Sequence, residues 1–375
     1  MRRDSWLIIL IVTLILGCER APVADVPDTV ASDQATFRVV EVAGGLEHPW
    51  AMAFLPDGDV LITERPGRLR IVREGVLDPT PIEGVPEVYA SGQGGLLDVV
   101  LDPDFASNRL IYLSYAAEGE DGAGTRVARA RLGDGGLEDL EVIFEGFMAG
   151  GGRHFGSRLG FDPDGYLFIT LGERGQDEHA QELGDLAGKV VRLHPDGSVP
   201  EGNPFAGRDD AAPEVFSYGH RNPQGLAVHP ETGRIWVVEH GPRGGDEVNL
   251  VAAGVNYGWP VITHGRAYSG LPMGEGSAKE GMAQPLHYWV PSISPSGLAF
   301  YGGDAFPQWQ GDLFTGGLSG EVLARLELDG ERVVEEERLL EGVLGRIRDV
   351  RVGPDGYLYL LTDESDGGLH RLEPA

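Results

Sequence analysis

The sequence predicts an all-β protein, and more specifically a six-bladed β-propeller. Three observations predict it: a high glycine content, a repeated turn-and-strand pattern, and little sequence with a helical period. Glycine accounts for 57 of the 375 residues, roughly twice average usage. Glycine at this density, without a collagen period, indicates many tight turns between short strands. Hydrophobic residues make up 41% of the chain, which is enough for a sizeable core.

One pattern recurs six times: an apolar residue, a turn of the Pro-Asp-Gly type, and then a strand. Asp-Gly between apolar strands is a strong hairpin signal. Six copies at spacings of roughly 45–75 residues predict blades around a channel, and FRVVEV at 37–42 is placed to close the ring in the last blade. The alternative is a β-sandwich of similar strand count. The copies are AFLPDGDVLITE at 53–64, VLDPDFASNRLIYLSY at 100–115, GFDPDGYLFITLGE at 160–173, AVHPETGRIWVVEHG at 227–241, AFYGGDAFPQWQGDLFTGG at 299–317 and RVGPDGYLYLLTD at 351–363.

The N-terminus is predicted to be a lipoprotein signal peptide over residues 1–17. Two arginines precede an apolar run that is too short for a comfortable membrane span, and the run ends in Leu-Gly-Cys. This junction resembles the bacterial lipobox, in which the cysteine, here Cys18, is lipidated. Residues 18–36 are rich in Pro, Ala, Asp and Ser and predict a flexible tether. We therefore expect one propeller domain over 37–375, anchored on the periplasmic side of a bacterial envelope, in the outer membrane. The alternative is an uncleaved anchor.

Charge and cysteine content exclude several classes of function. The formal net charge is −29, and such a surface repels nucleic acid and other polyanions. Cys18 is the single cysteine of the chain. An intramolecular disulfide and a thiolate cluster for zinc or iron are therefore excluded.

Several segments beside the repeat strands are too rich in glycine and too specifically charged to be packing. In a propeller they fall on loops at one mouth of the channel, where a scaffold positions functional groups. They are SGQGGLLDV at 91–99, AGGGRHFGSRL at 149–159, YGHRNPQGLA at 218–227, EHGPRGGDEVNL at 239–250, NYGWP at 256–260 and GRIRDVRVGPDG at 345–356.

These segments together resemble the soluble quinoprotein glucose dehydrogenases, and more closely their aldose sugar dehydrogenase relatives. The resemblance implies oxidation of an aldose sugar at its anomeric carbon to a lactone, with pyrroloquinoline quinone (PQQ) and Ca²⁺ as cofactors. Electrons would pass to an external acceptor such as a quinone, a cytochrome or a dye. His154 matches the general base of that family, a role that requires an imidazole that is neutral near working pH.

The resemblance also implies how the cofactors are held. Arg221 matches the arginine beside the reacting quinone oxygen, and Gln93 and Asn222 match its polar partners. Arg346 and Arg348 match a pair that grips the carboxylates of PQQ, and residues two apart on a strand face one side. The positions that match calcium ligands are Gly241 and Pro242, through backbone carbonyls, for the catalytic ion, and Glu247 and Tyr257 for a second, structural ion.

Two departures from the family pattern put cofactor affinity and sugar preference in doubt. The family carries a lysine where this chain has Ser319 nearby, and an acidic residue where it has Arg153. Two other functions are weighed: a calcium-dependent propeller lactonase and a non-enzymatic outer-membrane platform. The first would hold its metal with side-chain carboxylates, and the second would leave His154 and Arg221 without a role.

Overall fold

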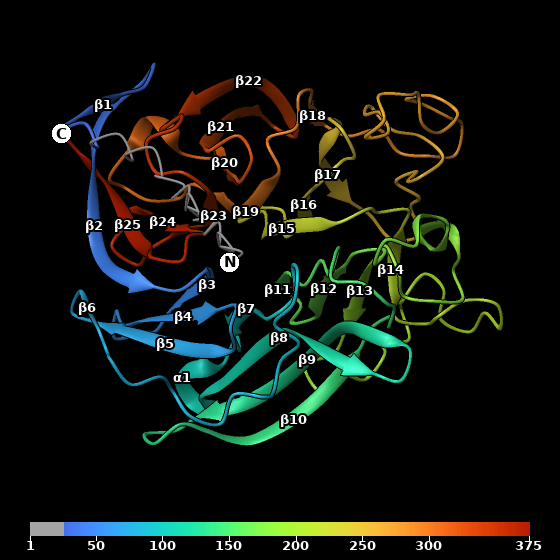
Figure 1. Ribbon diagram of the computed structural model, residues 1–375, viewed down its shortest axis with the longest axis horizontal. Coiled ribbons are helices and arrows are strands. Elements are labelled where there is room, and N and C mark those ends of the chain that lie inside the picture. The colour runs from blue at the N-terminus through green and yellow to red at the C-terminus, as the bar shows by residue number, and fades with distance from the viewer. Residues whose placement is uncertain (1–25) are drawn as a thin grey trace, which may run out of the picture.

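The computed structural model describes residues 26–375 and confirms the predicted six-bladed β-propeller. Five sheets have four strands and one has five, and the six sheets radiate from a common centre (Figure 1). The predicted signal peptide, Cys18 and the start of the tether lie outside the described residues. Within the described part, no helix has the length and apolar character needed to cross a membrane.

The strands follow one another along the chain, blade by blade. The first blade contains β3 (Pro49–Phe54), β4 (Val60–Glu64), β5 (Arg68–Arg73) and β6 (Val76–Leu77). The second and third contain β7 (Leu96–Leu101), β8 (Leu110–Gly119), β9 (Gly122–Leu132), β10 (Leu137–Glu145), β11 (Leu159–Phe161), β12 (Leu167–Leu171), β13 (Lys189–Leu193) and β14 (Val215–Tyr218). The fourth and fifth contain β15 (Pro223–Val228), β16 (Ile235–Glu239), β17 (Asp246–Val251), β18 (His287–Trp289), β19 (Pro295–Phe300), β20 (Leu313–Gly317), β21 (Val322–Asp329) and β22 (Arg332–Leu339). The sixth contains β23 (Ile347–Val352), β24 (Leu358–Thr362), β25 (Gly367–Pro374), β2 (Thr36–Leu46) and β1 (Val30–Ala31).

Among residues 26–375, helix is confined to three short pieces: α1 (Phe105–Asn108) and the 3₁₀ turns η1 (Asp177–Gln181) and η2 (Pro307–Trp309). Each copy of the repeated sequence pattern forms the first hairpin of a blade. The Asp-Gly turns need a left-handed residue, and φ is +93° at Gly58 and +83° at Gly165. The second strand of the hairpin is apolar because neighbouring blades cover both its faces; every residue of β4, β12, β16, β20 and β24 is buried.

The two ends of the described chain close the ring. β2 pairs antiparallel with β25, from Phe37 opposite Pro374 to Leu46 opposite Gly367. The strand expected from residues 37–42 therefore does join the last blade, where it covers the edge that β25 would otherwise expose. β1 pairs with β2 inside the range that composition assigns to the tether. The folded domain thus begins before residue 37, because backbone pairing orders a segment that has no hydrophobic period.

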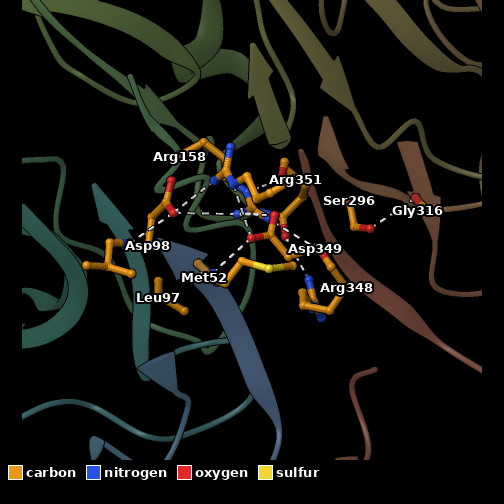
Figure 2. A network of polar contacts seen from close by, with 12 residues as sticks. Met52, Leu97, Asp98, Arg158, Ser296, Gly316, Arg348, Asp349 and Arg351 are labelled. Atoms are coloured by element: carbon orange, nitrogen blue, oxygen red, sulfur yellow. Dashed lines mark hydrogen bonds and ion pairs between the residues drawn. The ribbon is translucent and has the colours of Figure 1, made fainter. Parts of the chain in front are cut away.

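A network of buried charges joins the inner strands at the centre of the propeller (Figure 2). The Arg158 guanidinium, whose side chain is 1% exposed, lies 2.9 Å from Asp349 Oδ1 and 3.6 Å from Asp98 Oδ1. Arg351 lies 3.3 Å from each of these aspartates. Two carboxylates therefore meet two guanidinium groups, and the buried charges balance.

The same network ties the blades to one another through backbone groups. Arg158 donates to the carbonyls of Gln224 and Arg348, and Asp349 accepts the backbone N–H of Met52. Ser296 on β19 donates to the carbonyl of Ile347. With Asp98 on β7 and Arg158 next to β11, every inner strand has a contact in this chain of bonds. The network therefore fixes the six inner strands relative to one another, and with them the loops that precede these strands.

Candidate functional site

A cavity of about 240 Å³ opens at one mouth of the channel, and loops from different blades line it. The structure brings seven of the predicted site residues to this cavity: Gln93, His154, Arg221, Gly241, Pro242, Arg346 and Arg348. The cavity is also lined by Trp50, Arg65, Gln224, His240, Tyr268, Ser292, Ser294 and Leu318, which the sequence reasoning did not single out. No aspartate or glutamate side chain lines it within the described chain, which disfavours a lactonase that binds its metal through carboxylates.

A larger hollow, of about 380 Å³, lies between the first two blades near the Asp57 turn. It contains none of the predicted site residues. Its lining mixes aspartates with Arg73 and Arg109, and nothing in its arrangement indicates a ligand.

His154 is held in an unusual backbone conformation. Its φ is +56°, in the left-handed region that few residues other than glycine adopt. The Gln93 side-chain oxygen accepts the His154 backbone N–H at 2.7 Å, and the Gln93 backbone N–H donates to the Gly152 carbonyl at 2.7 Å. These two bonds join loops that are about 60 residues apart in sequence. Gln93 thus positions the histidine as well as lining the cavity.

The His154 ring is oriented by Glu173. Its Nδ1 lies 2.6 and 2.8 Å from the two carboxyl oxygens of Glu173, so Nε2 is the ring nitrogen that remains for a ligand in the cavity. Burial lowers the pKa of His154 to about 3, and the charges of Arg221, Arg153 and Arg174 act in the same direction. The imidazole is therefore neutral at physiological pH, as a general base requires.

Glu173 is the functional residue that the sequence reasoning missed. It lies two residues after the end of β12 and its side chain is fully buried, and burial raises the pKa of its carboxyl to about 7 although Arg221 opposes the shift. The available signal was its position: a charged residue just after a largely apolar strand, on the side of the propeller where the glycine-rich loops gather. Nothing local, however, indicates that it pairs with a histidine nineteen positions earlier.

Arginine side chains bring positive charge to the wall of the cavity. Arg221 donates to the carbonyls of Gly241, at 2.7 Å, and His240, at 3.2 Å. Arg348 lies 2.6 Å and Arg346 3.4 Å from the same carboxyl oxygen of Asp363. Burial alone would raise the pKa of Asp363, but Arg348 and Arg65 outweigh it and hold that pKa below its usual value.

Several donors at the cavity have no acceptor. Buried nitrogens without a hydrogen-bond partner include Nε of Arg65, Arg221 and Arg348, and Nδ2 of Asn222. Asn222 stands just behind the lining, where its Oδ1 accepts from Gly156 and Gln224. Buried donors are normally satisfied, so this set fits a ligand that carries several acceptor oxygens.

The predicted calcium-binding residues divide between two places. The Gly241–Pro242 loop lines the cavity and is held by Asp246, which accepts the backbone N–H of Gly241 at 2.8 Å. Glu247 and Tyr257 line a second, small hollow with Glu239, and this hollow adjoins the cavity because Arg221, His240 and Gly241 line both. Burial raises the pKa of Glu247 to about 8, and the neighbouring Glu239 adds to the shift.

The donor types at these two places are carbonyls and carboxylates, which suit calcium. The Tyr257 hydroxyl is already used, because it donates to the Leu250 carbonyl and accepts from the Ala252 N–H. Within residues 26–375, no group of three or more His, Cys, Asp and Glu side chains converges as a metal site. Backbone oxygens would therefore have to supply most of the ligands.

Comparison with known proteins agrees with this site. The model of the family described as "Glucose / Sorbosone dehydrogenase" matches residues 46–371. The aldose sugar dehydrogenase YliI of Escherichia coli is 47% identical over all of both chains. Quinoprotein glucose dehydrogenase B of Acinetobacter calcoaceticus is 28% identical, over 91% of this chain and 89% of that protein.

A solved structure, the PQQ-bound form of aldose sugar dehydrogenase from Streptomyces coelicolor, is 31% identical with a TM-score of 0.76. The match covers 90% of this chain and 99% of that one. The region matched by the family model includes every inner strand of the propeller and every loop that lines the cavity with its neutral histidine. The chain belongs to the glucose/sorbosone dehydrogenase family and is an oxidoreductase that acts on sugars.

Proposed function

We propose that this protein oxidises aldoses at the anomeric carbon to lactones, with PQQ and Ca²⁺ as its cofactors. One observation carries the proposal: a neutral histidine, held by a carboxyl group, faces a cavity lined by arginines whose Nε–H groups lack acceptors. A tricarboxylate quinone offers acceptors of the required kind, and PQQ is the group named in the Streptomyces coelicolor structure. Such a cofactor, when bound with calcium, supplies the two-electron acceptor.

The residues of the chain supply the remaining chemistry. His154 Nε2 takes the proton of the sugar hydroxyl, while Glu173 fixes the ring and stabilises the imidazolium that forms. Arg221 places positive charge where negative charge develops during the reaction. Arg346, Arg348 and Arg65 line the cavity and offer guanidinium groups to carboxylates. No haem-attachment motif is present in the sequence, so the electrons pass to an external acceptor.

Purified protein is expected to gain aldose-dependent dye reduction only when both PQQ and Ca²⁺ are added. The reason is that the buried nitrogens without partners need an anionic ligand, and the carbonyls of Gly241, which accepts from Arg221 in this structure, and Pro242 are oxygen ligands that would bind a cation. The measurement is dye reduction over a panel of monosaccharides and disaccharides, with each cofactor omitted in turn. Full activity in the presence of a chelator, or a requirement for a nicotinamide cofactor, would defeat the proposal.

Activity is expected to rise as the pH increases through about 7, because the pKa of Glu173 is raised to about 7. Below that pH the protonated carboxyl donates to Nδ1, which leaves the ring proton on Nε2 and removes the base. Above it the carboxylate accepts the Nδ1–H and frees Nε2. The test is the pH profile of kcat/KM for the wild type, Glu173→Gln and the exposed neighbour variant Glu178→Gln. The same midpoint in Glu173→Gln as in the wild type would show that another group titrates.

We also propose that Cys18 carries lipid and holds the protein on the periplasmic side of the outer membrane. The support is the Leu-Gly-Cys junction after a short apolar run. Cys18→Ser is expected to release the protein from the membrane fraction or to stall its processing. Fractionation of the variant with membranes, at the apparent mass of the wild type, would remove the lipoprotein assignment.

A further inference from the structure

A general base must lose its proton before the next turnover, and on the proposed function His154 is that base. Its Nε2 faces the cavity, which a bound sugar and cofactor fill. The other ring nitrogen faces away from the cavity, toward two carboxyl groups. The question is therefore where a proton leaving Nδ1 can go.

The two carboxyls are those of Glu173 and Asp177, and they form a continuous path from the ring toward solvent. Glu173 is fully buried and lies 2.6 Å from Nδ1. Its carboxyl is hydrogen-bonded to that of Asp177, the first residue of η1. Asp177 is only half-buried, and neither carboxyl lines the cavity. The path thus leads away from the side on which the sugar binds.

The electrostatics suit transfer in steps along this path. Burial raises the pKa of both carboxyls. Glu173 raises the pKa of Asp177 further, whereas the hydrogen bond with Asp177 lowers the pKa of Glu173, so the shared proton is favoured on Asp177, at the solvent end. Arg221 faces His154, Glu173 and Asp177, while Arg153 and Arg174 also face the ring. These arginines keep a proton from remaining on the imidazole. A proton on the pair of carboxyls is consequently held near neutral pH without being trapped.

We propose that Glu173 and Asp177 form a proton exit relay, with Asp177 as its solvent end. The aldose loses a hydride from its anomeric carbon to the quinone cofactor and a proton from its hydroxyl to His154 Nε2, and a C=O bond forms. The imidazolium gives its Nδ1 proton to Glu173, which passes one to Asp177 and so to water. One proton leaves the protein for each two electrons transferred. When product leaves, water in the cavity takes the Nε2 proton while the relay returns one to Nδ1, with no net change.

The test compares Asp177→Asn with the wild type and with Glu178→Gln, which removes an exposed charge at the next position of η1. Reconstituted protein is mixed with sugar in weak buffer, and cofactor reduction and proton release are followed together with an indicator dye. In Asp177→Asn, proton release should lag behind reduction, and a small diffusible base such as imidazole should abolish the lag. A structural defect would instead slow reduction itself and would not respond to buffer. Release that keeps pace with reduction in all three proteins, at every buffer concentration, overturns the relay.

A second measurement uses the cofactor-free protein and does not depend on the proposed reaction. Infrared spectroscopy near neutral pH should detect the C=O stretch of a protonated carboxyl in the wild type. Glu173→Gln should lose that band, Asp177→Asn should shift it, and Glu178→Gln should leave it unchanged. An unshifted band in Asp177→Asn overturns the carboxyl pair. If sugar never reduces the cofactor in the wild type while the infrared result holds, the proposed function fails and the carboxyl pair stands.

Discussion

His154→Asn is expected to lower turnover by roughly 10²–10⁴-fold, or about 3–5 kcal/mol of barrier, because the variant has no group that can take the sugar's hydroxyl proton. Asparagine is the appropriate replacement because it tolerates the left-handed backbone at this position, so the loss reports on chemistry rather than on folding. Cofactor affinity should change little, since the ring acts on the sugar. The measurements are kcat at saturating PQQ, PQQ affinity and Tm.

A matched control is His287→Asn. His287 lies on β18 outside the cavity and contacts Glu336, so its loss should leave turnover unchanged. Recovery of the His154→Asn rate by excess PQQ would mean that the ring binds cofactor and does not act as a base.

Arginine variants should show the opposite behaviour, but the structure changes which arginine is informative. The family resemblance gives Arg346 and Arg348 the same role, so by sequence alone either one could serve as a probe of cofactor affinity. Arg348 is in fact buried and lies 2.6 Å from buried Asp363, so its removal takes away the nearest of the cations around a buried carboxylate and destabilises the fold. Arg346, which is 40% exposed on its side chain, is the better probe. Arg346→Ala should weaken PQQ binding by about tenfold, the effect of losing a charge-assisted hydrogen bond, and excess PQQ should restore the rate.

The largest effect on stability is expected from Arg158→Met. This change leaves Asp98 and Asp349, both fully buried, with Arg351 as their only cationic partner in the network. Breaking a buried ion pair from one side typically costs about 3–5 kcal/mol. Equilibrium unfolding in urea should show this loss, while Arg332→Met, which removes an exposed pair with Asp329, should change the free energy of unfolding by less than about 1 kcal/mol.

The deficit should depend on pH, and its sign follows from Asp98. Burial already raises the pKa of Asp98, and Arg158 is the strongest group that opposes this shift. Without Arg158, that pKa rises further above its unfolded value. A carboxyl of this kind contributes stability at low pH that is lost as pH rises through the folded-state pKa. Arg158→Met should therefore lie closest to the wild type in acid; a deficit that is constant between pH 5 and 8 would contradict the assigned role.

The repeats and glycine-rich loops were sufficient to predict the fold and seven of the residues that line the cavity. Hairpin turns and apolar strands are local features, and six copies of them leave few arrangements other than a ring. The closing strand was likewise readable, because the last blade lacks an outer strand that residues 37–42 can supply. Gln93, His154, Arg221 and Arg346 lie on loops at one mouth because each stands one to five residues before the first strand of a blade.

Only the tertiary structure decided which partners hold those residues and which of them are protonated. The contact of Gln93 with His154 spans 61 positions, and that of Arg158 with the Arg348 carbonyl spans 190. No local pattern encodes such partners, because they arise where blades meet around the channel. Burial where the blades meet also sets the protonation states. Loss of contact with water lowers the pKa of His154, which keeps it neutral, and raises the pKa of Glu173, which contacts it. The types of the site residues and their positions on loops can therefore be predicted from the sequence. Their hydrogen-bond partners and their burial, which make His154 a base, arise only when the six blades pack together.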